Sequence, residues 1–360
     1  MSTAIPVTLL TGFLGAGKTT LLNALLGQPE MANTAVLINE FGEIGLDHLL
    51  VERLDGETVL LNAGCLCCTV RGDLAVALDG LWERVLAGQP IARVMIETTG
   101  LADPAPILQT LMGHPGLMRR FRLDGVVTLV DAVNGLATLD SQPEALRQAA
   151  VADLLLLTKT DLARPEAVAA LRARLAALNP VARVVVATGG AVAPGALLEL
   201  GPYDATAKSP DVAAWIGAAA PAHHHHHHDH HDHDHHHHHD HGHDPNRHGD
   251  AIQALCLEFD APLSWDGLAT WLEMLAMTRG ASVLRMKGLL DLKGEALPVV
   301  VHGVQQVFHP PRRLPAWPEG TPRRSRLVFV LRDLDPQVVR DGLDAFLRAA
   351  AERDALMAPS

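Results

Sequence analysis

The stretch "GFLGAGKT" at residues 12–19 decides the fold class of this chain. It matches the pattern G-x-x-x-x-G-K-[ST] at every fixed position, follows the apolar run "AIPVTLL" and opens a helical stretch over 18–27. Glycines let successive backbone N–H groups turn toward phosphate oxygens, and the N-terminus of the following helix adds partial positive charge. The sequence therefore predicts a phosphate-binding loop, and this context disfavours the alternative of a glycine-rich turn without a ligand.

The side chains of this loop have expected partners in a nucleotide complex. Lys18 supplies a full positive charge at the β- and γ-phosphates, and the Thr19 hydroxyl is an oxygen ligand for Mg²⁺. The other nucleotide contacts that we expect from the loop are Gly12, Gly15, Ala16, Gly17 and Thr20.

Apolar runs alternate with helical patterns from residue 3 to about 200. Short uninterrupted Val, Leu and Ile runs are typical of strands buried on both faces. The strand candidates are "AIPVTLL", "TAVLI", "TVLL", "IARVMIE", "GVVTLVDA", "ADLLLLT" and "ARVVVAT". Together with the loop they predict an α/β fold, a P-loop NTPase with a mostly parallel sheet flanked by helices.

The alternation breaks at residues 205–249, which divides the chain into three predicted parts. Residues 1–204 form the nucleotide-binding domain, and 205–249 form a disordered His-rich linker because they offer nothing to bury. In the remaining segment, 250–352, the strand candidate "AIQALCLEF" comes first, and further candidates such as "RLVFVL" are clustered between helices over 264–277 and 335–350. This order predicts a small α+β C-terminal domain.

Composition excludes several classes of protein. The formal net charge of -12 argues against nucleic acid as the main partner. No apolar run reaches the roughly 18 residues of a membrane span, and the N-terminus does not resemble a signal peptide. Three of the four cysteines lie within residues 65–68, which is a poor disulfide framework. We therefore expect a reduced, cytoplasmic protein without a membrane partner.

Two later motifs follow strand candidates in an order that suits a guanine nucleotide. "TKTD" at 158–161 resembles the guanine-reading N-K-x-D motif, with Thr158 in place of Asn. Asp161 can accept hydrogen bonds from guanine N1–H and its amino group, and the stem of Lys159 can pack along the base. In "IETTG" at 96–100, Glu97 is expected near Mg²⁺ and the Gly100 amide near the γ-phosphate. Lys18, Thr19, Glu97 and Gly100 form the expected catalytic set. Asp131 is either another strand-end group or a helix N-cap.

The segment "GCLCC" at 64–68 provides the thiols Cys65, Cys67 and Cys68. Soft sulfur ligands select Zn²⁺, Cu⁺ or similar ions, and three protein ligands leave one position open for transfer. Water, a carboxylate such as Glu43, or a client group can complete the site. Small buried residues or thiol–disulfide chemistry are the alternatives. Because the thiols lie between "NEFGEIGLD" (39–47) and "IETTG", we hypothesise that nucleotide state alters metal affinity.

Histidines dominate residues 223–244, which hold 16 histidines and five aspartates and begin with His223, His224, His225, His226, His227 and His228. Neutral imidazole binds zinc, nickel and cobalt, so this segment predicts a multi-site metal-capture tract, and a solvated spacer is the alternative. Elsewhere we expect Cys256 in the core, His114 in an exposed loop, and His302 and His309 in structural or surface positions.

The motif set "GFLGAGKTT", "NEFGEIGLD", "GCLCC", "ETTGLADP" and "TKTD", in this order, resembles the CobW family of metal-handling P-loop GTPases, which includes the zinc-regulated GTPase metalloprotein activators. "RMKG" (285–288) and "VVVHGVQ" (300–306) resemble its C-terminal domain. The resemblance implies weak hydrolysis of GTP to GDP with Mg²⁺, and Zn²⁺ or Co²⁺ on Cys65, Cys67 and Cys68. It also implies metal transfer to a client metalloprotein, and a homodimer is a possible assembly.

Two competing functions remain open at this point. A metal buffer or storage protein would use its nucleotide site to set conformation, and metal-stimulated GTP turnover distinguishes it from a GTPase chaperone. A P-loop kinase for a small molecule is disfavoured by the guanine motif and the thiols. The departure of Thr158 from Asn makes base selectivity the weakest part of the guanine interpretation.

Overall fold

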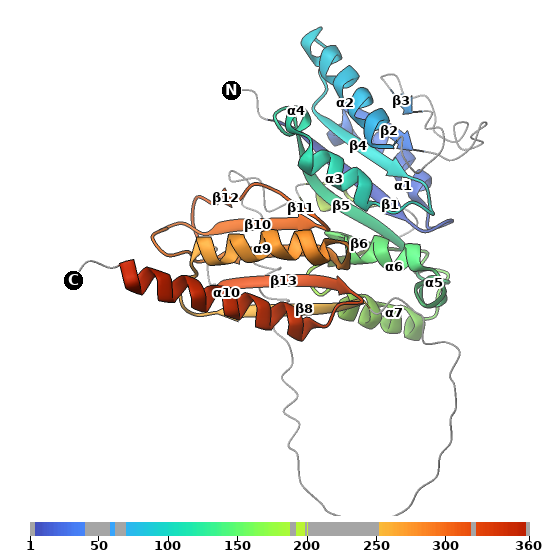
Figure 1. The fold of residues 1–360 in the computed structure, drawn as a ribbon. Helices are drawn as coiled ribbons and strands as arrows, with labels where there is room; N and C mark the ends of the chain where they lie inside the picture. The colour runs from blue at the N-terminus through green and yellow to red at the C-terminus, as the bar shows by residue number, and fades with distance from the viewer. Residues whose placement is uncertain are drawn as a thin grey trace, which may run out of the picture.

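The chain forms two sheets, each with its own helices (Figure 1). The computed structural model describes residues 4–39, 58–61, 70–187, 192–198, 200, 252–317 and 322–357. The predicted linker 205–249 lies outside these residues, and the domain limits 1–204 and 250–352 stay predictions. Within the described part, no helix combines the length and apolar character that crossing a bilayer requires.

The first sheet has seven parallel strands in the order β3-β2-β4-β1-β5-β6-β7. Their bounds are β1 Ile5–Gly12, β2 Thr34–Asn39, β3 Thr58–Leu61, β4 Arg93–Thr98, β5 Phe121–Asp131, β6 Leu154–Thr158 and β7 Arg183–Val186. The central strand β1 pairs with β4 and β5, so Leu9 lies between Ile96 and Val126. Leu and Val on β1, β2, β4, β5 and β6 are almost fully buried, which confirms the parallel α/β prediction.

Helices cover both faces of this sheet. They are α1 Lys18–Leu26, α2 Val70–Leu86, α3 Ala105–Gly113, α4 Pro115–Met118, α5 Gly135–Ser141, α6 Pro143–Ala150 and α7 Pro165–Leu178, with 3-10 turns at Pro29–Met31 and Pro194–Ala196. On one face α1 buries Leu21, Leu22 and Leu25, while α2, α3 and α6 pack against the other face. Proline opens α4, α6 and α7, where its missing N–H costs nothing and its fixed φ suits the first turn.

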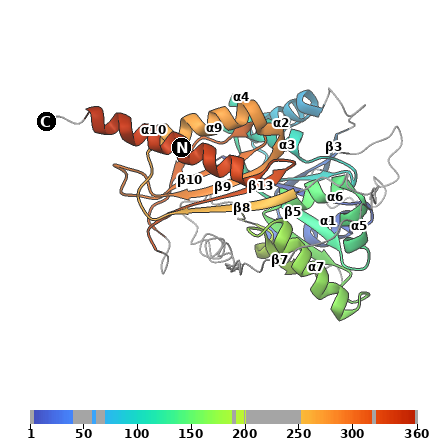
Figure 2. The ribbon, with the colours of Figure 1, turned by 60° about the horizontal axis from the view of Figure 1, so that its bottom comes forward.

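The second sheet is antiparallel, in the order β11-β10-β9-β13-β8, and β12 pairs with β10. Its elements are β8 Ile252–Phe259, α9 Trp265–Arg279, η4 Gly280–Ser282, β9 Val283–Leu290, β10 Val299–Val304, β11 Val307–Phe308, β12 Arg312–Arg313, β13 Ser325–Arg332 and α10 Pro336–Met357. Helices α9 and α10 cover one face, as Figure 2 shows, and Trp271 packs edge-on against Phe329 with ring centroids 5.7 Å apart. The expected α+β domain is present, and its last helix runs past the predicted end at 350.

The other face of the second sheet packs against the first domain. Leu284, Val304 and Val330 join the apolar core that contains α2, α3 and β5. Gln109 of α3 donates to the Gln305 side chain over 2.6 Å. Cys256, expected in the core, is half-buried and packs with Val181 and Val328 of the two domains, where burial raises the pKa of its thiol.

Buried charges connect the domains at one point. Asp153, just before β6, pairs with Arg285 over 2.7 Å and with Lys287, both on β9. Burial alone would raise the pKa of Asp153, but the charges of the two cations outweigh it and lower the pKa to about 2. His302 on β10 pairs in register with Lys287 and is 1% exposed, so it is a structural residue.

Candidate nucleotide and metal site

The phosphate loop joins β1 to α1, as the sequence predicts. Gly12 ends the strand with φ 142°, and a Cβ there would lie 2.5 Å from the carbonyl oxygen of Leu129. Gly17 precedes α1 with φ 94°, in the left-handed region that side chains disfavour. Both positions therefore require glycine. Gly15 is exposed on the loop, Ala16 is buried and Thr20 is exposed.

Lys18 opens α1 and its ammonium group turns back over the loop. Its Nζ donates to the carbonyl oxygens of Gly12 over 2.9 Å and Phe13 over 3.3 Å. The residue is 9% exposed, so its positive charge is held close to the backbone of the loop. Charge and amide donors together suit a phosphate chain.

Thr19 connects the loop to the end of β4. Its hydroxyl donates to Glu97 Oε1 over 2.9 Å, and Glu97 is 5% exposed. A hydroxyl and a carboxylate are hard oxygen ligands of the kind that Mg²⁺ prefers. These two residues therefore fit the metal of an Mg²⁺–nucleotide complex.

The loop after β4 touches the phosphate loop directly. At Gly100 an added Cβ would lie 2.6 Å from the backbone nitrogen of Leu14, so no larger residue fits without a backbone shift. At the end of β4, the Thr98 hydroxyl donates to the hydroxyl of Thr11 on β1 over 2.8 Å. The structure thus brings Lys18, Thr19, Glu97 and Gly100 together at the carboxyl ends of β1 and β4.

The base motif begins where β6 ends. Thr158 is 5% exposed and its hydroxyl donates to the Ala16 carbonyl oxygen of the phosphate loop over 2.8 Å. Lys159 has φ 56° and its ammonium pairs with Asp131 Oδ2 over 2.7 Å, an ion pair that sequence reasoning missed. Asp161 is exposed, so its carboxylate is accessible to a base.

Asp131 is the strand-end group whose role the sequence left open. Its Oδ1 accepts from the Val133 backbone N–H over 2.7 Å, and α5 begins after Asn134, so Asp131 closes the preceding turn and is not the N-cap itself. Partial burial would raise the pKa of Asp131, but hydrogen bonds from Lys159, Val133 and Asn134 lower it. A stable carboxylate therefore fixes Lys159.

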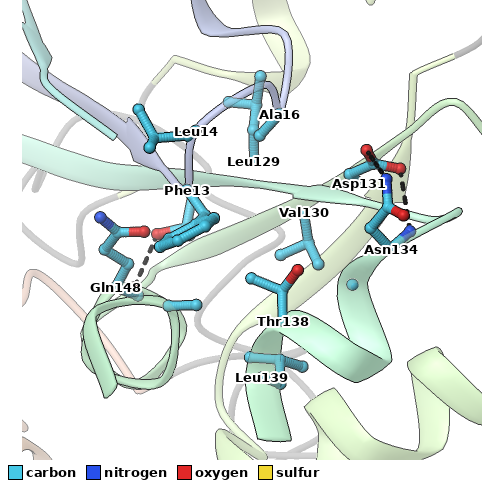
Figure 3. Close-up of a pocket in the computed structure, with 13 residues that line it drawn as sticks. Phe13, Leu14, Ala16, Leu129, Val130, Asp131, Asn134, Thr138, Leu139 and Gln148 are labelled. Carbon is cyan, nitrogen blue, oxygen red and sulfur yellow. Dashed lines mark hydrogen bonds between the residues drawn. The ribbon is translucent and has the colours of Figure 1, made fainter. Parts of the chain in front are cut away.

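A cavity of about 220 Å³ lies beside the phosphate loop (Figure 3). Phe13 and Leu14 of the loop line one side of the cavity. Val130 and Leu139 are among the apolar residues that line the rest. Gln148 of α6 also lines it. Sequence reasoning did not identify this glutamine, since its contacts lie far along the chain.

The predicted ligands of the transferred metal, unlike Thr19, lie outside the described residues. These are Cys65, Cys67, Cys68, Glu43 and the run His223–His228. Across the described ranges, no three His, Cys, Asp or Glu side chains gather as a metal site would require. His114, considered as an accessory ligand, is exposed, and its Nδ1 accepts from the Leu117 N–H at the start of α4.

Comparison with known families decides the identity of this fold. Residues 6–186 match the model of the CobW/HypB/UreG nucleotide-binding domain. The chain belongs to the CobW family. Residues 252–347 match the C-terminal domain of the same family, described as the cobalamin synthesis protein cobW C-terminal domain.

Characterised CobW relatives extend over nearly the full length. The zinc chaperone YjiA of Escherichia coli is 33% identical over 337 residues, covering 93% of this chain and 96% of the relative. The zinc chaperone CobW of Pseudomonas aeruginosa is 31% identical over 374 residues, covering 94% and 90%. The crystal structure of Zn(II)-bound YjiA GTPase from E. coli superposes with a TM-score of 0.66 at 29% identity, covering 96% of this chain and 99% of that one.

Proposed function

We propose that this CobW-family protein is a GTP-hydrolysing metallochaperone that binds Zn²⁺ or Co²⁺ on Cys65, Cys67 and Cys68 and transfers it to a client metalloprotein. The observation that carries the proposal is the contact of Thr19 with Glu97, 2.9 Å apart, which joins the phosphate loop to the strand end expected beside the γ-phosphate. Relatives that are zinc chaperones support the metal role.

The residues have distinct parts in the proposed hydrolysis. Lys18 neutralises charge at the β- and γ-phosphates, and the Gly100 N–H contacts the γ-phosphate. Thr19 and Glu97 would hold Mg²⁺, which would offset the negative charge of the phosphates. Asp161 reads the guanine edge, while Thr158 and Lys159 shape the base site.

Metal-stimulated turnover tests this function. The chain is purified without added metal, its metal content is measured, and GTP hydrolysis is followed with and without Zn²⁺ or Co²⁺. We expect stimulation in the parent, and none in the Cys65/Cys67/Cys68→Ser variant. Cys256→Ser is the matched control and should respond like the parent. Metal binding without any change in GTP turnover would contradict the chaperone and indicate a metal buffer instead.

The proposed coupling has its own measurement. Because the thiols lie in sequence between residues 39–47 and 96–100, Zn²⁺ affinity should differ between complexes with a non-hydrolysable GTP analogue and with GDP. Equal affinities would remove nucleotide-driven transfer from the proposal. Deletion of 223–243 should lower metal stoichiometry and leave GTP turnover intact, because the tract is assigned to capture and not to transfer.

A further inference from the structure

Gln148 of helix α6 holds the loop that follows β4. The residue is fully buried, at 0% exposed, and its Nε2 donates to the carbonyl oxygens of Gly100 over 3.1 Å and Ala102 over 3.0 Å. Its Oε1 is buried and accepts no hydrogen bond from the residues that the structure describes. A buried acceptor of this kind calls for an explanation, because burying an unpaired polar atom costs free energy.

The neighbouring residue holds the far end of the same loop. Arg147 Nε lies 3.6 Å from Asp103 Oδ2, and Asp103 Oδ1 accepts from the Ala105 N–H where α3 begins. One turn of α6 therefore contacts the loop near Gly100, at Ala102 and at Asp103. The loop cannot turn its peptide groups without exchanging these contacts.

Helix α6 is itself held against the sheet by hydrogen bonds. The Thr128 hydroxyl of β5 donates to the carbonyl oxygen of Gln148 over 2.8 Å. The fully buried Asn179 donates from Nδ2 to three carbonyl oxygens at the end of α6, those of Ala149, Ala150 and Ala152, over 3.0, 3.1 and 3.0 Å. The glutamine thus projects from a rigid support, as a positioning group requires.

The same segment of chain reaches the second domain. Asp153 follows the end of α6 and makes the buried ion pairs with Arg285 and Lys287 on β9. Its Oδ2 also accepts from the Val126 N–H of β5 over 2.8 Å. One end of the short segment 147–153 therefore contacts the loop, and its other end contacts the second domain.

We propose that Gln148 is the positioning residue for the Gly100 loop, and that segment 147–153 transmits the position of this loop to the second domain. The inference rests on the proposed function, in which the Gly100 N–H contacts the γ-phosphate. The carboxamide offers two arrangements: Nε2 holds carbonyls in the present one, and the unused Oε1 can accept an N–H when the loop turns. Two discrete hydrogen-bonding states are what a transmitted change needs.

Nucleotide preference tests the positioning role. The Kd for GDP is divided by the Kd for a non-hydrolysable GTP analogue, both with Mg²⁺, in the parent and in Gln148→Leu. We expect this ratio to fall about tenfold in the variant, because the analogue binds more weakly. The Kd for GDP should stay within about twofold of the parent value. Because KM approaches Kd when hydrolysis is slow, the KM for GTP should rise with the Kd of the analogue, while the nearly unchanged Kd for GDP separates this effect from general destabilisation.

The matched control is Gln109→Leu, the same change at another buried glutamine, whose carboxamide bonds Gln305 of the second domain. It should keep the parent ratio, and an equal drop in both variants would overturn the inference. Should Gln148→Leu fail to fold, Arg147→Met removes the Asp103 contact and should lower the ratio severalfold, while an unchanged ratio would overturn the proposal. A parent that discriminates between the nucleotides but hydrolyses no GTP would refute the proposed enzyme and leave this test valid.

Hydrogen exchange tests the transmitted change. Peptides covering β9 and β10 should exchange at different rates in the analogue and GDP complexes of the parent. Gln148→Leu should abolish the difference. Identical exchange in the two parent complexes, or a difference that persists in the variant, would overturn transmission through α6.

Discussion

Thr158 donates its hydroxyl hydrogen to the carbonyl oxygen of Ala16 over 2.8 Å, so the base motif is bonded directly to the phosphate loop. A threonine hydroxyl has one hydrogen to donate, and this contact uses it. Thr158 therefore positions the loop but has no hydrogen left to donate to the purine. Within this motif, recognition of the base therefore depends on Asp161, which is exposed.

Substituting Thr158 should separate these two contributions. Thr158→Val removes a hydrogen bond worth about 1 kcal/mol, so binding of GTP and ATP analogues should weaken similarly, by about fivefold. Thr158→Asn adds a carboxamide that can donate both to Ala16 and to the base, so it should increase the preference for GTP over ATP. Dissociation constants for both nucleotides measure this. A selective loss of GTP binding in Thr158→Val would contradict the tethering role.

Glu97→Gln should act on the metal requirement of nucleotide binding. The change removes a nearly buried negative charge beside Thr19 while keeping an oxygen that can accept its hydrogen bond. We expect a higher Mg²⁺ concentration for half-maximal turnover, by about tenfold, because the carboxylate strengthens Mg²⁺ binding. GTP binding measured without Mg²⁺ should be unchanged or tighter, since a charge that repels phosphate is gone. Weaker metal-free binding would oppose this assignment.

His302 should make the protein less stable in mild acid. Burial and the nearby His309 lower the pKa of His302 to about 3, although the charge of Asp153 acts to raise it. The unfolded chain takes up this proton near pH 6.5, so stability is complete above that pH and falls as the pH drops toward 3. The loss approaches about 4–5 kcal/mol at the low end. The free energy of unfolding of His302→Gln, measured with denaturant between pH 7 and 4, should fall less with decreasing pH than that of the parent. An equal fall in both would contradict this role of His302.

Asp153 affects the pH dependence of stability over a lower pH range. Its folded pKa of about 2 lies below the unfolded value, so its stabilisation is present above about pH 4 and is lost as the pH falls toward 2. Asp153→Asn leaves Arg285 and Lys287 buried beside a neutral group, and should cost about 3–5 kcal/mol at pH 7. Asp153→Asn combined with Arg285→Met should recover part of this cost in denaturant unfolding. Full additivity of the two changes would contradict direct pairing.

The parallel sheet and the phosphate loop were predictable because their signals are local. Uninterrupted Val and Leu runs match β1, β4, β5 and β6, and the loop spacing fixes a strand–helix turn at residues 12–19. The polar contacts of Gln148 and Asp131 were not predictable in this way. A buried glutamine in an Ala-rich helix and a strand-end aspartate look like many solvent-exposed residues, because their partners Gly100 and Lys159 are set by packing.

By itself the sequence determined the order of the motifs, the α/β class and the family resemblance, because each depends on residues adjacent in the chain. Tertiary structure alone decided which distant groups meet. Gln148 reaches Gly100 across 48 residues and Arg285 reaches Asp153 across 132. The physical reason is that buried polar atoms must find partners within hydrogen-bond distance, and packing of α6 between two domains selects those partners.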